Sequence, residues 1–144
     1  MPKLLQLFAA LILVAALASG CAVNRATANI DPSANVSALK TMYVKIEPED
    51  KQTYSLIVDK LRGKGVNVTA GAEATPPGVD AVVTYVDKWM WDITMYMLEL
   101  TVVIREPNTN FPLATGNSLH TSLTRLSPKE MVDEVIDNIY KGNK

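Results

Sequence analysis

Apolar and polar residues follow clear periodicities from about residue 39 onward. Alternation over 41–47 predicts a half-buried strand. Apolar residues recur at helical spacing over 51–62, and Gly63 follows, so we expect a helix that ends there. A short strand over 66–70 completes a strand, helix, strand unit, in which we expect the two strands to be parallel.

The segment 80–105 has large apolar residues at odd positions up to Trp91 and at even positions from Tyr96 onward. A chain reversal between them would form an antiparallel hairpin that pairs Trp91 with Tyr96 and Trp89 with Leu98. The turn lacks the glycine or asparagine that tight hairpins prefer, so one continuous strand with a bulge is the alternative. In the hairpin both tryptophans face the helices, which favours a core position for them.

The C-terminal third predicts a turn, a strand and a helix. The turn over 106–110 leads into a polar strand over 111–121, whose Pro112 and Gly116 suit the edge of a sheet. A capping box over 127–130 begins a helix with one apolar stripe. The prediction is a two-layer α+β fold. It has one mixed, mostly antiparallel sheet in β-α-β-β-β-β-α order and two helices packed on one face.

The N-terminus has the three-part layout of a secretory signal. Lys3 precedes a run over 4–18 that is apolar except for Gln6, and small residues follow. The run is shorter than the roughly 20 apolar residues that cross a bilayer, so we expect cleavage.

The end of this run resembles the lipobox of bacterial lipoproteins. Leu17, Ala18, Ser19 and Gly20 precede Cys21, with Ala18 in place of the family's usual leucine. The resemblance implies cleavage after Gly20, a diacylglyceryl group on the Cys21 sulfur, and acylation of the new amino terminus. Cys21 is the single cysteine, so a disulfide within the chain is impossible, and a free thiol is uncommon in an exported protein.

The residues after Cys21 predict the destination and the domain boundaries. In Gram-negative lipoproteins an aspartate after the acylated cysteine retains the protein in the inner membrane, and this chain has Ala22. The resemblance therefore implies the outer membrane, facing the periplasm. We expect a signal peptide over 1–20, a flexible tether with lipidated Cys21 over 21–38, and a single small α+β domain over 39–144, because 22–38 is small, polar and without periodicity.

Charge and side-chain chemistry exclude several classes of function. Without its signal the chain has a formal net charge of −2, which gives no general attraction to nucleic acid. His120 is the single histidine and cannot supply a metal cluster, while Asp87 and Asp92 have opposite parity and point to different sheet faces. We therefore expect no enzyme, no metal and no cofactor.

The runs 85–96, 113–116 and 127–132 resemble small uncharacterised lipoproteins of proteobacteria, which implies no activity. We expect an outer-membrane lipoprotein that acts as a noncatalytic envelope adaptor or assembly component with a protein partner. The alternative is a binder or carrier of an apolar envelope ligand such as lipid. The candidate partner or ligand surface is the edge strand over 111–121, the outer sheet face, or the set Trp89, Met90, Trp91, Tyr96 and Met97.

Overall fold

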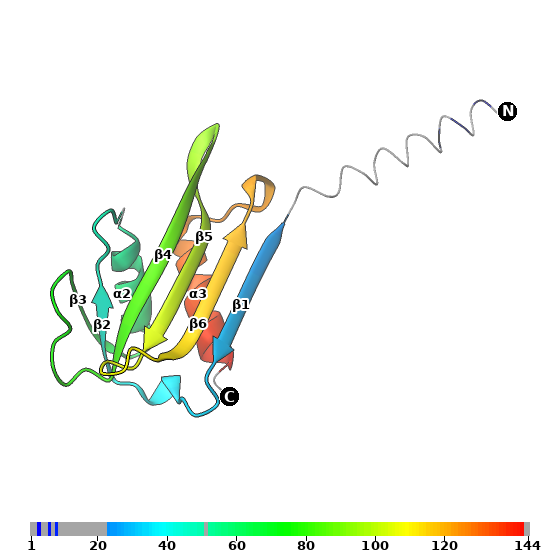
Figure 1. Ribbon diagram of the computed structural model, residues 1–144. Helices are drawn as coiled ribbons and strands as arrows, with labels where there is room; N and C mark the ends of the chain where they lie inside the picture. The colour runs from blue at the N-terminus through cyan, green and yellow to red at the C-terminus, as the bar shows by residue number, and fades with distance from the viewer. Residues whose placement is uncertain (1–2, 4–5, 7, 9–22, 51, 143–144) are drawn as a thin grey trace.

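A six-stranded sheet with two helices on one face forms the core of the molecule (Figure 1). The computed structural model describes residues 3, 6, 8, 23–50 and 52–142. The strands are β1 (Asn24–Ile30), β2 (Thr41–Lys45), β3 (Asn67–Gly71), β4 (Ala81–Asp92), β5 (Thr94–Arg105) and β6 (Pro112–His120), and their spatial order is β1-β6-β5-β4-β2-β3. The helices are α2 (Thr53–Gly63) and α3 (Pro128–Gly142), with short 3-10 helices η2 (Val36–Ala38) and η3 (Ser122–Thr124). The predicted α+β class and two-layer architecture are confirmed.

The parallel part of the sheet follows the predicted crossover. β2 pairs in parallel with both β3 and β4, and α2 connects β2 to β3. Ile57, Val58 and Leu61 form the buried stripe of α2 against the sheet. Within the described residues, no helix is both long and apolar enough to cross a bilayer.

The capping box at the start of α3 is present. The Ser127 hydroxyl accepts a hydrogen bond from the backbone N–H of Glu130 at 3.3 Å, and the Glu130 carboxylate accepts one from the backbone N–H of Ser127 at 2.8 Å. These reciprocal bonds satisfy groups that a helix start leaves unpaired. They hold the apolar stripe of α3 over the sheet.

The segment predicted as a flexible tether forms an edge strand instead. β1 pairs antiparallel with β6 from Asn24 opposite His120 to Ile30 opposite Ala114. Its alternation was not visible in the sequence because the inward residues are small, although Ile30 packs against the core. Two predictions are corrected: residues 24–30 are part of the domain, and the strand over 111–121 lies inside the sheet. Cys21 and the predicted cleavage residues 17–20 lie outside the described residues.

The predicted hairpin is confirmed, and the alternative of one continuous strand is wrong, although the hairpin contains a bulge of its own. Tyr85 lies opposite Val102 as expected, but a bulge between Lys88 and Trp89 shifts the register by one residue. Trp89 therefore lies opposite Met97, not Leu98, and the pairings predicted for both tryptophans are wrong. Beyond the bulge, the hairpin extends past the neighbouring strands at the upper end of the view in Figure 1.

Candidate functional site

The end of the β4–β5 hairpin exposes a cluster of large apolar side chains. We call residues 90–95 the hairpin tip. Trp91 is 69% exposed, Ile93 87%, Met90 45% and Met95 50%. The prediction that Trp91 belongs to the core is corrected, because it lies on the projecting part of the hairpin. Exposed apolar side chains gathered at one place mark a contact surface more often than isolated ones do.

The apex of the tip has an unfavourable backbone conformation. Asp92 lies opposite Thr94, which leaves Ile93 alone at the turn with φ of 61°. Glycine and asparagine adopt this left-handed region easily, whereas a β-branched side chain is strained there. The sequence thus has an exposed isoleucine where both the backbone and water favour another residue. Strain of this kind concentrates at functional sites.

Polar contacts hold the tip against the η3 segment. Ser122 donates a hydrogen bond to the Asp92 carboxylate, and the Arg125 guanidinium donates to the Thr94 hydroxyl at 2.9 Å. Arg125 also lies 4.5 Å from the centre of the Tyr96 ring, within cation–π range, and 3.7 Å from Asp92. The apolar side chains are therefore presented on a braced hairpin.

The five residues predicted as a partner or ligand surface do not form one surface. Met90 and Trp91 belong to the hairpin tip, whereas Tyr96 and Met97 are buried. Trp89 is half-buried against the core, and its indole N–H donates to the Asp87 carboxylate at 2.9 Å. Sequence reasoning missed Ile93 and Met95. The signal for them is an apolar turn that lacks glycine and asparagine.

His120 belongs to a buried polar cluster that ties β6 to α3. Its Nε2 lies 2.8 Å from the Glu134 carboxylate, and its Nδ1 lies 2.9 Å from the carbonyl oxygen of Thr124. Ser118 is fully buried and donates to Glu134 by a short hydrogen bond, not to His120. The carboxylate thus stands between serine and histidine, an order that does not activate a serine nucleophile. Over the described part of the chain, no group of three acidic, histidine or cysteine side chains is placed to hold a metal ion.

The sheet face opposite the helices is polar and organised around Glu99. Its carboxylate pairs with Lys88 at 2.7 Å, accepts a hydrogen bond from Asn117 at 2.9 Å, and lies 4.0 Å from Arg25. The hydrogen bonds from Lys88 and then Asn117 lower the pKa of Glu99. Val86 is 59% exposed on this same face. Around Glu99 the face therefore combines paired charges with an exposed apolar side chain.

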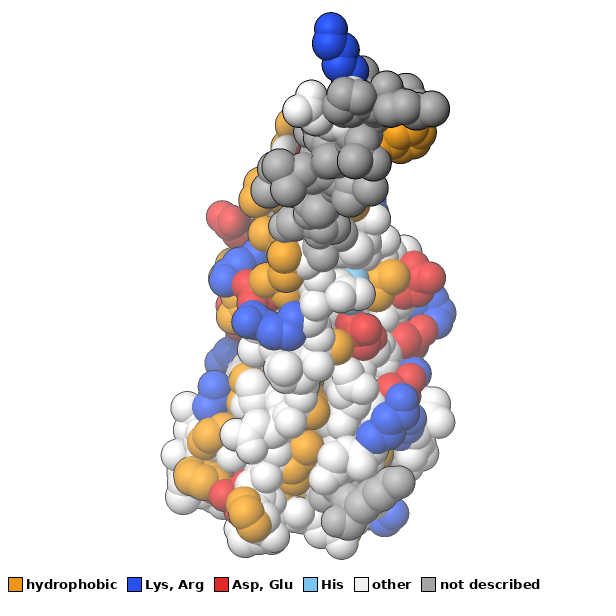
Figure 2. Space-filling view, turned by 90° about the vertical axis from the view of Figure 1, so that its right-hand side faces the viewer, with side chains coloured by type: hydrophobic (Ala, Val, Ile, Leu, Met, Phe, Trp, Pro, Cys, Tyr) orange, Lys and Arg blue, Asp and Glu red, His pale blue; other side chains and the backbone are white. Residues whose placement is uncertain are grey.

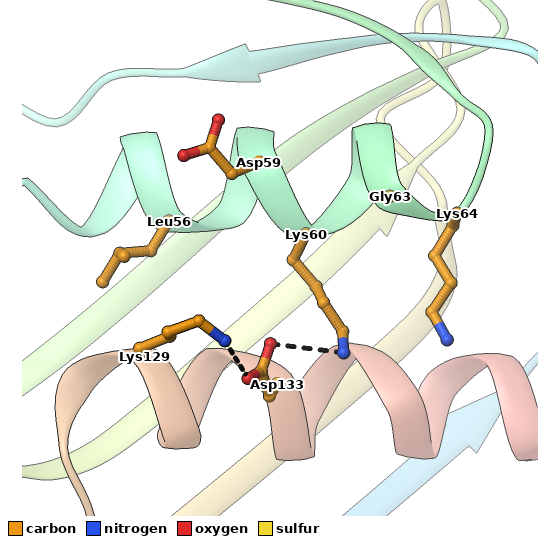
Figure 3. Close-up of a pocket in the computed structure, with 7 residues that line it drawn as sticks. All are labelled: Leu56, Asp59, Lys60, Gly63, Lys64, Lys129 and Asp133. Atoms are coloured by element: carbon orange, nitrogen blue, oxygen red, sulfur yellow. Dashed lines mark hydrogen bonds and ion pairs between the residues drawn. The ribbon is translucent and has the colours of Figure 1, made fainter.

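A groove of about 380 Å³ separates α2 from α3 (Figure 3). Lys60 pairs with Asp133 at 3.2 Å and with Asp137 at 2.9 Å, and Lys129 pairs with Asp133 at 2.6 Å. The hydrogen bond from Lys129 is the main cause of the lowered pKa of Asp133. Lys64 also pairs with Asp137, at 2.7 Å. Carboxylates already neutralise these cations, so the groove is a poor site for an anion. Its ion pairs instead join the two helices.

Comparison with known proteins identifies the fold. No protein-family model matches the sequence, and no curated protein sequence matches it. A PelC dodecamer from Paraburkholderia phytofirmans has a subunit 12% identical over 81% of this chain and 97% of its own, with a TM-score of 0.60. The chain shares that fold. A DUF4136 family protein from Bacteroides thetaiotaomicron also matches, at 10% identity over 83% of this chain and 95% of its own, with a TM-score of 0.53.

A minor lipoprotein from Acinetobacter baumannii is 14% identical over 72% of this chain and 89% of its own, but its TM-score of 0.37 is too low to carry an argument. At these identities the structural similarities establish the fold alone.

Proposed function

We propose that the chain is a lipoprotein held in the periplasmic leaflet of the outer membrane by acylated Cys21, where it acts as a noncatalytic adaptor or assembly component. The observation that carries the adaptor role is the sheet face that neither α2 nor α3 covers (Figure 1). When a sheet is buried throughout, helices normally cover both of its faces. Here one face, with its ordered charges and exposed Val86, is open to a partner.

Fixed charges on this face suit recognition of a protein surface. Glu99 is held by Lys88, Asn117 and Arg25, so its position changes little when a partner approaches. Such charge arrangements contribute more to the choice and orientation of a partner than to affinity. Val86, exposed on the same face, adds apolar area to the contact.

One form of the assembly role is a complex built from several copies of this chain. The PelC neighbour of the same fold is a dodecamer. Among the described strands, β1 and β3 each pair on one side only, so each sheet edge presents backbone groups to a neighbour. Figure 2 looks onto the β1 edge, where polar side chains and backbone make up much of the described surface.

The geometry gives less support to a carrier of an apolar ligand. That role would need Trp89, Trp91, Tyr96 and Met97 to line a common groove. Tyr96 and Met97 are instead buried in the domain, and Trp91 projects into solvent. The adaptor role is therefore the better-supported of the two.

Photo-crosslinking in cells tests the adaptor role. A photoreactive amino acid at Val86 is expected to give a discrete protein adduct, because that side chain projects from the open face. The matched control is the same amino acid at Asp59, which is exposed on α2 in the helix layer. Absence of an adduct at Val86, or equal adducts at both sites, would contradict an adaptor role for this face.

Replacement of the lipidated residue tests the anchor. Cys21→Ser is expected to block acylation and processing, which leaves a protein that carries no acyl group and keeps its signal. Mass spectrometry of the purified wild-type protein should show the acyl groups at Cys21. Recovery of a fully processed, membrane-held Cys21→Ser variant would contradict lipidation at this residue.

A further inference from the structure

Exposed apolar side chains gather at one end of the molecule. Eight large apolar residues are exposed within 23–50 and 52–142, and six of them lie at the end that carries the hairpin tip. The six are Val23, Met90, Trp91, Ile93, Met95 and Leu123. Leu123 belongs to η3, whose Ser122 contacts Asp92 next to the apex of the tip. The apolar character therefore belongs to one end of the molecule and is not spread over its surface.

The continuously described part of the chain begins at this same end, with Val23. The backbone of Val23 is fixed by hydrogen bonds to Thr121 in both directions, each 3.1 Å long. Cys21 stands two positions before this fixed point, and at about 3.3 Å per residue the chain between them spans at most roughly 7 Å. Because β1 is part of the sheet, the acylated residue stays close to the edge of the domain.

The strand register places the tip on the membrane side of that fixed point. Leu119 lies opposite Glu99, so Thr121, which holds Val23, is level with Met97. Ile93 lies four residues further along β5, and at about 3.4 Å per residue the tip projects roughly 13 Å beyond that level. Figure 1 shows the start of β1 and the hairpin tip at the same, upper end of the molecule. A bilayer that holds the lipid of Cys21 is therefore within reach of the tip.

The chemistry of the tip suits the interface between lipid headgroups and acyl chains. Trp91 has an apolar ring with one polar N–H, the combination that is enriched at membrane interfaces. Met90, Ile93 and Met95 add apolar side chains around it. Asp92 is the one charged residue between 90 and 95, and it is paired with Ser122 and Arg125. A position in the membrane would also explain the isoleucine at this strained position, because its exposed side chain would lie in an apolar medium.

We propose that the hairpin tip inserts into the same leaflet that holds the lipid of Cys21. The inference rests on the proposed lipid anchor and adds a second, protein-borne contact with the bilayer. The acyl chains provide most of the affinity for the membrane, so the tip mainly sets the orientation of the domain. Two contacts at one end hold the strands upright, with the β5–β6 turn furthest from the membrane and the open sheet face accessible from the side.

Lipid quenching of tryptophan emission tests the proposal. The lipidated protein is placed in vesicles of phosphatidylethanolamine and phosphatidylglycerol with brominated acyl chains. The Trp89→Phe variant keeps Trp91, whose emission is expected to be lost relative to vesicles without bromine. The matched Trp91→Phe variant keeps Trp89, which is half-buried against the core, and its emission should change little.

A third variant tests the apex directly. Ile93→Asn, combined with Trp89→Phe, places a polar residue that favours the left-handed backbone at the apex. It should weaken the quenching of Trp91, while the acyl groups at Cys21 remain. Unchanged quenching would contradict insertion of the apex.

The outcomes separate this proposal from the proposed function. Mass spectrometry of Cys21 comes first, and an unmodified thiol would overturn both. With the acyl groups present, unquenched emission from Trp91 overturns insertion and leaves the anchor and adaptor role standing. If Trp91 is protected from an aqueous quencher but not quenched by brominated lipid, a protein covers the tip and insertion is likewise overturned.

Discussion

At the scale of single residues, Ile93 shows where stability and a surface role conflict. A β-branched side chain at φ of 61° is strained, and 87% of this one is exposed. We predict that Ile93→Asn raises the free energy of unfolding by about 1 kcal/mol, because asparagine adopts the left-handed region with less strain. Urea denaturation of the lipidated protein in detergent measures the change.

The control for this prediction keeps the branched side chain. Ile93→Val retains the β-branch and should leave the free energy of unfolding unchanged. A stability gain in both variants would show that side-chain size, and not backbone strain, is the cause. A gain in neither variant would show that the backbone at Ile93 is not strained.

Glu106 shows how a single turn depends on pH. Its carboxylate accepts hydrogen bonds from the Thr109 hydroxyl, at 2.7 Å, and from the backbone N–H groups of Thr109 and Asn108. These bonds, the hydroxyl bond first, lower its pKa from 4.5 to about 2. Because the folded-state pKa is lowered, the stabilisation is present above pH 4.5 and is lost as the pH falls toward about 2.

We predict that Thr109→Val raises the pKa of Glu106 toward its usual value, because the main donor is removed. An NMR titration of the carboxyl carbon measures the shift. Thr109→Ser, which keeps the hydroxyl, should leave the pKa near its low value. Equal titration curves for valine and serine would contradict the assigned cause.

At the scale of secondary-structure elements, Gly116 allows α3 to pack closely over β6. A Cβ atom at this position would lie 2.8 Å from Val135 Cγ1 and 3.0 Å from Ile139 Cδ1. We predict that Gly116→Ala lowers the free energy of unfolding by about 1–3 kcal/mol, because the helix or its side chains must shift. Thermal unfolding measures the loss.

Two further variants identify the close contact as the cause. Gly63→Ala in α2 meets no atom within 4 Å and should be neutral or slightly stabilising. Val135→Ala combined with Gly116→Ala should cost less than the sum of the single changes, because the first makes room for the second. Strict additivity would contradict packing of α3 through this glycine.

The elements that the sequence predicts best are those with strong local signals. The capping box at Ser127 and the helical stripe of α2 depend on neighbours along the chain, and both are present. The bulge at Lys88 has no such signal, because it is set by how β4 and β5 pair. A shift of one residue changed the partners of both tryptophans.

The candidate site was predictable only in part, for the same reason. Met90 and Trp91 were named from their apolar character in the sequence, but their exposure depends on how far the hairpin projects beyond the sheet. The contact between His120 and Glu134 joins a strand to a helix, and no sequence spacing indicates it.

At the scale of the whole molecule, β1 determines how far the domain stands from its anchor. A flexible tether over 22–38 would reach on the order of 55 Å when extended, whereas β1 begins at Asn24, three residues after Cys21. Ala26 and Ala28 hide the strand pattern because they are small and leave Ile30 as the one large apolar residue of β1. The sequence therefore predicted a domain far from its anchor, whereas in the structure the sheet begins three residues after Cys21.

Replacing Asn24–Ile30 by a glycine and serine segment of equal length keeps the reach of the chain but removes the strand's packing residues and its β propensity. Because β6 then loses one partner, its amides should exchange with solvent faster, and the melting temperature should fall. Hydrogen exchange measured by mass spectrometry over 112–120 measures the effect. Inserting the same glycine and serine segment between Ala22 and Val23 should leave exchange in β6 unchanged, since β1 stays paired. If replacement and insertion give the same exchange, residues 24–30 act as a linker, and the domain is free to move away from the membrane.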